Sequence, residues 1–212
     1  MAFNPIIVIQ FAVLLFAITI HEASHAWIAN LCGDPTAAYM GRVTLNPVPH
    51  IDPIGTILIP LFLMIFSPGF GLIGWGKPCP VNPNNFRNLR RDEILVSIAG
   101  VTSNLVAALA SLFLLKLFLI VGITSQGLSI LLRIMFQLNC VLLLFNLIPI
   151  PPLDGSHVMK QFLPAATVER LAFLDRWGFL ILLLLINTPL FDYFFSVFMY
   201  PFNRLFFLVM GI

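Results

Sequence analysis

Long apolar stretches separated by short polar loops run along most of the chain. Residues 3–31, 92–121 and 128–150 can each cross a bilayer of about 30 Å, because a helix rises 1.5 Å per residue. Residues 177–190 begin another apolar stretch, and residues 194–210 can span the bilayer or lie at its interface. The pattern predicts an all-α polytopic membrane protein with about five to six apolar segments.

Two further stretches depart from this pattern. In residues 53–73, glycines and prolines interrupt an apolar run that is just long enough to cross. The loops on either side carry Arg42, Lys77, Arg87, Arg90 and Arg91. The positive-inside rule would place both loops in the cytoplasm, which favours a re-entrant segment that lines a cavity. In residues 39–46, β-branched and polar residues alternate, which predicts a short β-hairpin or strand.

Composition supports a membrane protein and excludes other classes. Of 212 residues, 59% are hydrophobic and 9% are charged, with a mean hydropathy of +1.00. The net charge of +2 is too small to indicate a nucleic-acid partner. Cys32, Cys79 and Cys140 are odd in number and far apart, which predicts free thiols. The N-terminus has no basic region or cleavage site, so we expect the first helix to stay in the mature protein.

The sequence His21-Glu22-Ala23-Ser24-His25 lies inside the first apolar stretch. In a helix, residues four apart share one face, so the two imidazoles would lie one above the other and could hold one zinc ion. Glu22 would lie next to this ion. Ionisable side chains inside a membrane helix carry a desolvation cost of a few kcal/mol or more, which favours a functional site over a packing cluster.

A catalytic zinc site needs a third protein ligand, and Asp154 is the candidate. Three prolines within residues 149–152 end the preceding helix and present this carboxylate from an unwound turn. The rival ligands are Asp34, Asp52, His50 and His157. A turn explains Asp34 and a helix cap explains Asp52, which leaves His157 as the strongest alternative or as a neighbour of the ligands. Loop charges place the end of the first helix and Asp154 on the same side of the membrane.

This ligand set predicts metal-assisted peptide hydrolysis. Zinc would lower the pKa of a water molecule towards 7, and Glu22 would take its proton and deliver it to the leaving amine. Asn146 either contacts the substrate or the oxyanion, or satisfies carbonyls at a helix end. Val43 and Thr44, on the predicted strand, could hold an extended peptide by β-addition.

The motifs HEASH, Gly100-Val-Thr-Ser-Asn104 and NLIPIPPLDG resemble those of the intramembrane zinc metalloproteases of the site-2 protease family. The similarity covers residues 3–160 and implies one zinc ion on His21, His25 and Asp154, with Glu22 as the acid and base. It also implies that Asn146 contacts the substrate. Gly100 and Asn104, in the motif between the other two, are expected to bind substrate as well. The implied substrates are single-span membrane proteins.

Two features set this chain apart from many members of that family. Val101 follows Ala99-Gly100 where many relatives have proline, and the chain leaves no room for PDZ or CBS domains. The motif GWGKPCPVNP, which begins at Gly74, is similar to a compact bacterial or archaeal subgroup. We therefore expect a catalytic transmembrane core in residues 1–160 and transmembrane or interfacial helices in residues 161–212.

The expected location is a prokaryotic inner membrane, with the site towards the cytoplasm, the lipid bilayer as a partner, and no nucleic acid. Two other functions fit some of the same residues. A metal-ion transporter would need internal repeats, and the sequence has no clear repeat. A relative without catalytic activity would only bind membrane segments, although every expected catalytic position is filled. The sequence leaves the oligomeric state open.

Overall fold

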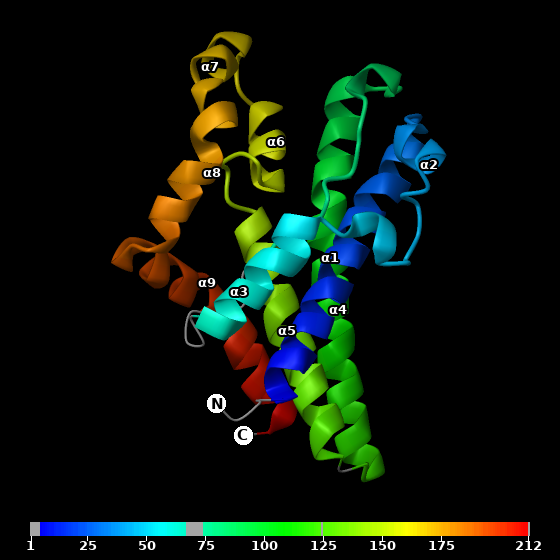
Figure 1. Ribbon diagram of the computed structural model, residues 1–212, viewed down its shortest axis with the longest axis vertical. Helices are drawn as coiled ribbons and strands as arrows, with labels where there is room; N and C mark the ends of the chain where they lie inside the picture. The colour runs from blue at the N-terminus through cyan, green and yellow to red at the C-terminus, as the bar shows by residue number, and fades with distance from the viewer. Residues whose placement is uncertain (1–4, 67–73, 124, 212) are drawn as a thin grey trace.

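The computed structural model describes residues 5–66, 74–123 and 125–211, which are mostly helical (Figure 1). The longer helices are α1 (Pro5–Cys32), α4 (Leu89–Val121), α5 (Gln126–Asn146), α8 (Phe173–Ile186) and α9 (Pro189–Met210). The shorter ones are α2 (Thr36–Tyr39), α3 (Ile59–Phe66), α6 (Asp154–Lys160) and α7 (Ala165–Arg170). Single turns of 3-10 helix form at Val48–His50 and Pro83–Asn85, and Pro53–Leu58 is π-helical.

Four helices are long and apolar enough to cross a membrane: α1, α4, α5 and α9. The first three confirm the spans predicted from the hydrophobic pattern, and α9 resolves the final apolar stretch as a candidate span. The stretch predicted from residue 177 forms α8, which has 14 residues and therefore covers only about 21 Å, less than the apolar thickness of a bilayer. The larger number of five to six segments is not confirmed in the part of the chain that the structure describes.

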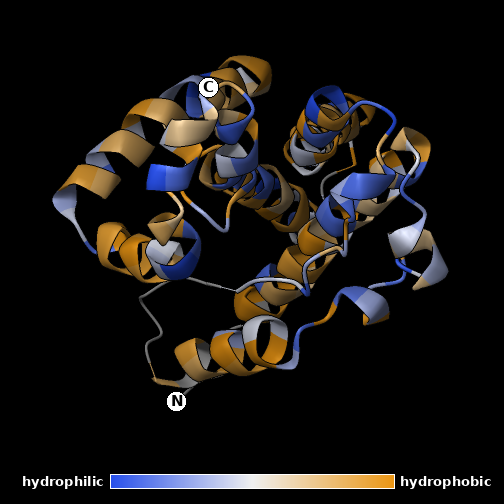
Figure 2. Cartoon of the chain, turned by 90° about the horizontal axis from the view of Figure 1, so that it is seen from above, coloured by the Kyte–Doolittle hydropathy of each residue, from blue (hydrophilic) through white to orange (hydrophobic). Residues whose placement is uncertain are grey.

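Helices α1, α4 and α5 pack against one another and form the centre of the molecule. Small side chains allow this close packing, since Ala17, Ala26 and Ala108 are buried. Leu112 and Phe136 fill the interface of α4 with α5, and side chains of α9 pack against them. Figure 2, coloured by hydropathy, shows apolar residues along most of these helices and hydrophilic residues mainly in the connecting segments. The bundle therefore presents apolar surface to lipid.

The segment predicted to re-enter the membrane is helical where the structure describes it. Asp52 directly precedes the π-helical stretch Pro53–Leu58 as its N-cap. Its carboxylate accepts hydrogen bonds from the amides of Ile54 and Gly55 at 3.0 and 2.6 Å. The role of Asp52 as a helix cap is thus confirmed. Residues 67–73, the second part of the predicted segment, lie outside the described residues. The re-entrant path is not confirmed.

The predicted strand or hairpin at residues 39–46 is wrong. Tyr39 ends α2, the following residues form turns and bends, and no strand occurs in residues 5–66, 74–123 or 125–211. Gly41 takes a left-handed φ of +68°, which lets the Arg42 amide turn back and donate to the carbonyl of Ala37 at 2.9 Å. These local bonds use the backbone groups that a strand would need. The alternating side chains alone could not reveal this turn.

The ends of these helices place most of the basic loops on one side of the molecule. In Figure 1, α2, α6, α7 and the start of α4 lie near the top, where α1 ends, and the start of α1 and the end of α9 lie near the bottom. Arg90 and Arg91 at the start of α4 and Arg170 in α7 belong to these upper segments. The turn after α5 lies on the same side as the end of α1, as the loop charges predict.

Candidate metal centre

Two histidines on one face of α1 form the first part of the site. His21 and His25 are one helical turn apart and almost fully buried, and their Nε2 atoms lie 3.0 Å from each other. The Nδ1 atom of His25 lies 2.7 Å from the carbonyl oxygen of Val96 on α4. In the tautomer in which Nδ1 carries the proton and donates it to this carbonyl, the lone pair of Nε2 is free for a metal ion.

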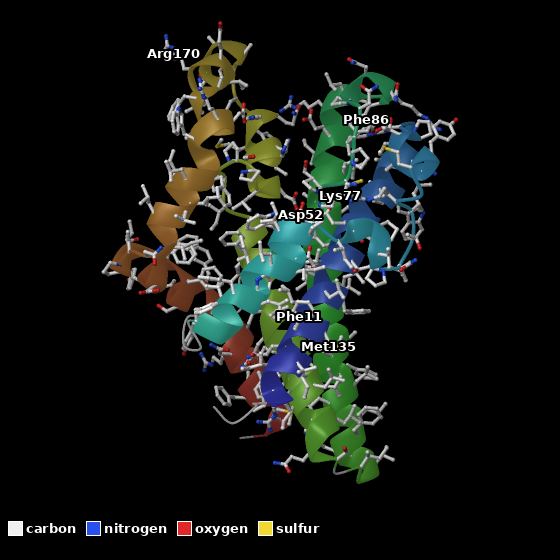
Figure 3. All side chains as sticks on the ribbon, in the orientation of Figure 1. Phe11, Asp52, Lys77, Phe86, Met135 and Arg170 are labelled. Carbon is white, nitrogen blue, oxygen red and sulfur yellow. The ribbon has the colours of Figure 1, made fainter. Side chains whose placement is uncertain are left out.

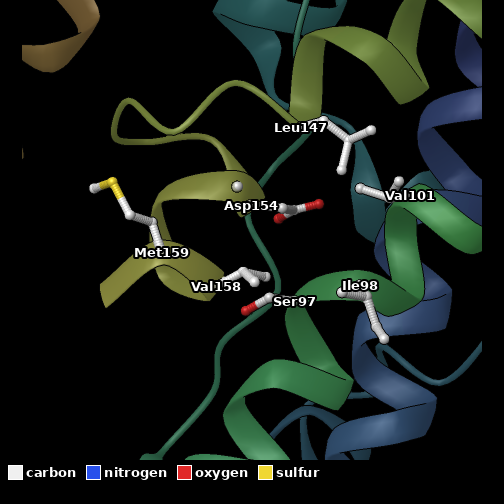
Figure 4. Close-up of a pocket in the computed structure, with 8 residues that line it drawn as sticks. Ser97, Ile98, Val101, Leu147, Asp154, Val158 and Met159 are labelled. Carbon is white, nitrogen blue, oxygen red and sulfur yellow. The ribbon is translucent and has the colours of Figure 1, made fainter. Parts of the chain in front are cut away.

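Asp154 completes a group of three possible ligands. It is the first residue of α6, and its Oδ2 atom lies 3.3 Å from His21 Nε2 and 3.4 Å from His25 Nε2. The close-up in Figure 4 shows the carboxylate pointing from α6 towards the region of Val101. The turn before it passes very close to α6, because a Cβ atom on Gly155 would lie 2.3 Å from the carbonyl oxygen of Leu147. Glycine is therefore needed directly after the aspartate.

The three ligand atoms fit one tetrahedral zinc ion. All lie within 4.8 Å of one another, and Oδ2 of Asp154 is buried without a hydrogen-bond donor. A tetrahedron with metal–ligand bonds of about 2.0 Å has edges of about 3.3 Å. The observed separations of 3.0, 3.3 and 3.4 Å match three such edges. A zinc ion held by these three atoms would keep its fourth position for water or substrate.

Gly100 lies directly against both imidazoles. A Cβ atom at this position would lie 2.4 Å from Cε1 of His21 and 2.5 Å from Nε2 of His25, distances at which atoms overlap. Only glycine lets α4 approach the two histidines this closely. The family resemblance associates Gly100 with substrate, whereas its contacts here are with the histidines, and it does not line the large cavity described below.

Glu22 is held by a main-chain group far along the sequence. Its Oε2 atom accepts a hydrogen bond of 2.8 Å from the amide of Cys79. Burial, and to a smaller extent the Glu22 carboxylate, raise the pKa of the Cys79 thiol to about 12, so this thiol is neutral at physiological pH. The sequence predicted Cys79 only as a free thiol. It gave no sign of the hydrogen bond from the main-chain amide of Cys79 to Glu22, because every residue type except proline carries such an amide.

A large cavity opens beside the three possible ligands. Its volume is about 1130 Å³, and Glu22, Asn104, Asn146 and His157 are among the residues that line it. Asn104 is fully buried, and neither its amide nitrogen nor its amide oxygen has a hydrogen-bond partner. Asn146 donates from its side chain to the carbonyl of Leu142 at 3.0 Å, which is the bond expected of a helix-end amide. Both asparagines border the space where a substrate would lie.

Val43 and Thr44 lie outside this cavity. Neither lines it, and the carbonyl oxygen of Thr44 accepts a hydrogen bond from the buried His50 at 2.9 Å. The predicted β-addition of a peptide at Val43 and Thr44 depended on a strand that the structure lacks. That mode of substrate binding therefore has no structural basis.

The rival ligands all have other partners. Asp34 accepts hydrogen bonds from the main chain of Asn82 at 2.7 Å and the side chain of Asn85 at 2.8 Å, which hold these residues against the end of α1. His157 faces the cavity, and its Nδ1 atom lies 3.8 Å from Glu93 on α4. His50 and Asp52 are engaged in loop and cap contacts. The structure brings only Asp154 to the two histidines among the described residues.

Two histidines and an aspartate that converge beside a glutamate, within a bundle of membrane-length helices, define a zinc metallopeptidase of the membrane. Residues 118–185 match the profile of Peptidase family M50. The chain is 42% identical over 185 residues to the "Putative zinc metalloprotease YwhC" of Bacillus subtilis, a match that spans 85% of this chain and 80% of that protein. The chain thus belongs to peptidase family M50, the site-2 protease family, and zinc is its cofactor.

More distant relatives carry similar names. The chain is 30% identical over 191 residues to the "Putative zinc metalloprotease Rip2" of Mycolicibacterium smegmatis and to that of Mycobacterium tuberculosis, with 89% of this chain and 70% of each relative covered. No solved structure matches the chain at a significant level.

Proposed function

We propose that this protein is an intramembrane zinc-dependent endopeptidase that cleaves transmembrane or membrane-proximal segments of single-span membrane proteins. The observation that carries this proposal is the approach of Asp154 to His21 and His25 within the depth of a membrane-spanning helix. A soluble peptidase has no need to bury its ligands in such a helix, where each ionisable group is costly.

His21, His25 and Asp154 are the proposed zinc ligands. When bound, the ion lowers the pKa of a water molecule towards 7 and polarises the carbonyl of the scissile peptide. The contact of His25 with the Val96 carbonyl fixes the direction in which its imidazole faces, at a distance of 2.7 Å. The same contact raises the basicity of the ligand nitrogen.

Glu22 is the proposed general base and acid. It borders the cavity beside the histidines, and it can take a proton from the attacking water and deliver it to the leaving amine. The hydrogen bond from the Cys79 amide holds one carboxylate oxygen and leaves the other to exchange the proton. Such positioning is what general catalysis requires of a side chain with several rotatable bonds.

The cavity suits an apolar peptide that has lost its helical hydrogen bonds. Leu142, Phe179 and Leu182 contribute apolar surface, whereas Asn104 and Asn146 contribute amide groups. A helical peptide bond hides its carbonyl in the i to i−4 ladder, so a substrate helix must unwind before cleavage. The free donor and acceptor of Asn104 could pair with the backbone groups that unwinding exposes.

We also propose that the protein lies in a prokaryotic inner membrane, and the positive-inside rule supports a site that faces the cytoplasm. Basic residues gather in the segments around the end of α1, near the candidate metal centre. The four candidate spans would lie in the bilayer, with α1, α4 and α5 around the site.

The test compares the wild type with Glu22→Gln in detergent on a panel of single-span substrates. We expect both proteins to bind one zinc per chain, and cleavage by the variant to fall by about 10²–10⁴-fold. Glu169→Gln, on the exposed α7, is the matched control and should cleave at the wild-type rate. Equal cleavage by Glu22→Gln would contradict the proposed role of Glu22. A wild type that binds zinc and membrane segments but cleaves none would be a relative without catalytic activity.

A further inference from the structure

The segment of residues 74–82 crosses α1 at Glu22 and is anchored at several points. The main-chain amide of Trp75 donates to the carbonyl of Gly55 at 3.2 Å, and that of Lys77 donates to the carbonyl of His50 at 2.9 Å. Lys77, labelled in Figure 3, lies beside α1 near the centre of the molecule. A Cβ atom on Gly76 would lie 2.5 Å from Cγ2 of Ile18, so the segment lies directly on α1 one turn before Glu22.

The last of these anchors is a buried arginine. Arg42 is 3% exposed, and its Nη2 atom donates to the carbonyls of Lys77 and of Pro78, the latter at 3.2 Å. These carbonyls immediately precede Cys79, whose amide donates to Glu22 at 2.8 Å. Arg42 thus fixes the peptide groups next to the one that holds the glutamate.

The burial of Arg42 needs an explanation. Within residues 5–66, 74–123 and 125–211, no carboxylate forms an ion pair with it, and its Nε atom has no hydrogen-bond partner. A buried cation without a carboxylate costs folding free energy, because main-chain carbonyls replace only part of its hydration. Both bonds come from Nη2, whose two hydrogens the planar guanidinium holds in fixed directions, whereas the three donors of a lysine ammonium rotate freely. The arrangement favours geometry at the expense of stability, as functional sites often do.

We propose that Arg42 is a positioning residue for the general base. By fixing the Lys77 and Pro78 carbonyls, it places the amide of Cys79 on the Glu22 carboxylate. Arg42 itself does not line the cavity, and its side-chain hydrogen bonds go to the carbonyls of Lys77 and Pro78, of which only Pro78 lines it. Its effect passes through the 74–82 segment alone. The proposal rests on the function proposed above, in which Glu22 is the base.

Arg42→Met removes the guanidinium and keeps an apolar stem in its place. We expect kcat to fall by about 10–100-fold, because a catalytic group displaced by about 1 Å costs about that factor. Zinc per chain should stay at the wild-type value, since His21, His25 and Asp154 lie on α1 and α6. KM should change less than kcat, since most residues that line the cavity lie outside the 74–82 segment. The kcat of Arg42→Lys should lie between those of the wild type and Arg42→Met. Arg42→Lys replaces Arg42→Met in this test if Arg42→Met does not fold. Arg170→Met, on the exposed α7, is the control.

A double-mutant cycle tests whether Arg42 acts through the Cys79 amide. Cys79→Pro removes the donated N–H, and Cys79→Ala keeps it and measures the effect of losing the thiol alone. If Arg42 acts through this amide, Arg42→Met should cause little further loss of kcat in the Cys79→Pro background. Losses that multiply in the double variant would overturn the proposal, as would loss of zinc from Arg42→Met.

Hydrogen exchange gives a readout that needs no substrate. Amides of the 74–82 segment should exchange at least severalfold faster in Arg42→Met than in the wild type. Unchanged exchange would overturn the proposal even if the wild type cleaves nothing. A wild type that cleaves, a Glu22→Gln variant that does not, and an Arg42→Met variant at full rate would refute the role of Arg42 and leave the proposed function standing.

Discussion

Replacement of Gly100 by alanine should damage the proposed metal centre without replacing any of its three ligands. The added Cβ atom would lie 2.4 Å from Cε1 of His21 and 2.5 Å from Nε2 of His25. Non-bonded carbon atoms rest at about 3.5–4.0 Å, so the imidazoles or α4 must move by about 1 Å. The three ligand atoms lie only 3.0–3.4 Å apart, and a shift of this size would open the triangle that they form.

We expect Gly100→Ala to bind zinc about 10–100-fold more weakly, as changes beside metal ligands do. Cleavage at saturating zinc should fall by about 100-fold. A competition titration against a zinc chelator in detergent measures the affinity. Gly127→Ala is the matched control, because a Cβ atom at Gly127 of α5 would meet no atom within 4 Å. Wild-type zinc affinity in Gly100→Ala would refute the close packing of α4 on the histidines.

Two further predictions concern residues outside the three ligands. Burial raises the pKa of the Asp34 carboxyl, but hydrogen bonds from Thr36, Asn82 and Asn85 outweigh it and hold the pKa below its ordinary value. Because the folded pKa lies below the unfolded value of about 4, this stabilisation is present above pH 4 and is lost as pH falls through the folded pKa. The wild type should unfold at a higher temperature than Asp34→Asn at pH 7, and this difference in unfolding temperature should shrink below about pH 4. A difference that does not depend on pH would contradict the role of Asp34. Replacement of Asn104 by leucine removes two buried unpartnered polar atoms, whose burial costs about 1–3 kcal/mol, so Asn104→Leu should unfold at the same or a higher temperature while its KM for substrate rises. A lower unfolding temperature would show that the amide is bonded within the fold.

The sequence predicted those features that depend on residues close together along the chain. The spacing of His21 and His25 follows from the helical period, and the spans of α1, α4 and α5 follow from runs of apolar residues. The prolines before Asp154 predicted that the helix ends there, and the turn that follows α5 brings the carboxylate of Asp154 back to α1. The selection of Asp154 from several acidic residues also drew on the family resemblance.

The sequence was uninformative where distant segments approach each other. The amide of Cys79 reaches Glu22 across 57 positions, and Arg42 reaches Lys77 across 35. Main-chain groups leave no mark in the residue type, and a glycine such as Gly100 does not reveal which side chains approach it. The alternation in residues 39–46 predicted a strand because it describes side chains only, whereas the turn at Gly41 decided the backbone path.

The most direct test of the central claim is to locate zinc in crystals by anomalous scattering at its absorption edge. We expect a single ion about 2.0–2.2 Å from Nε2 of His21, Nε2 of His25 and a carboxylate oxygen of Asp154. An ion bound elsewhere, or one held by the histidines without Asp154, would contradict the claim.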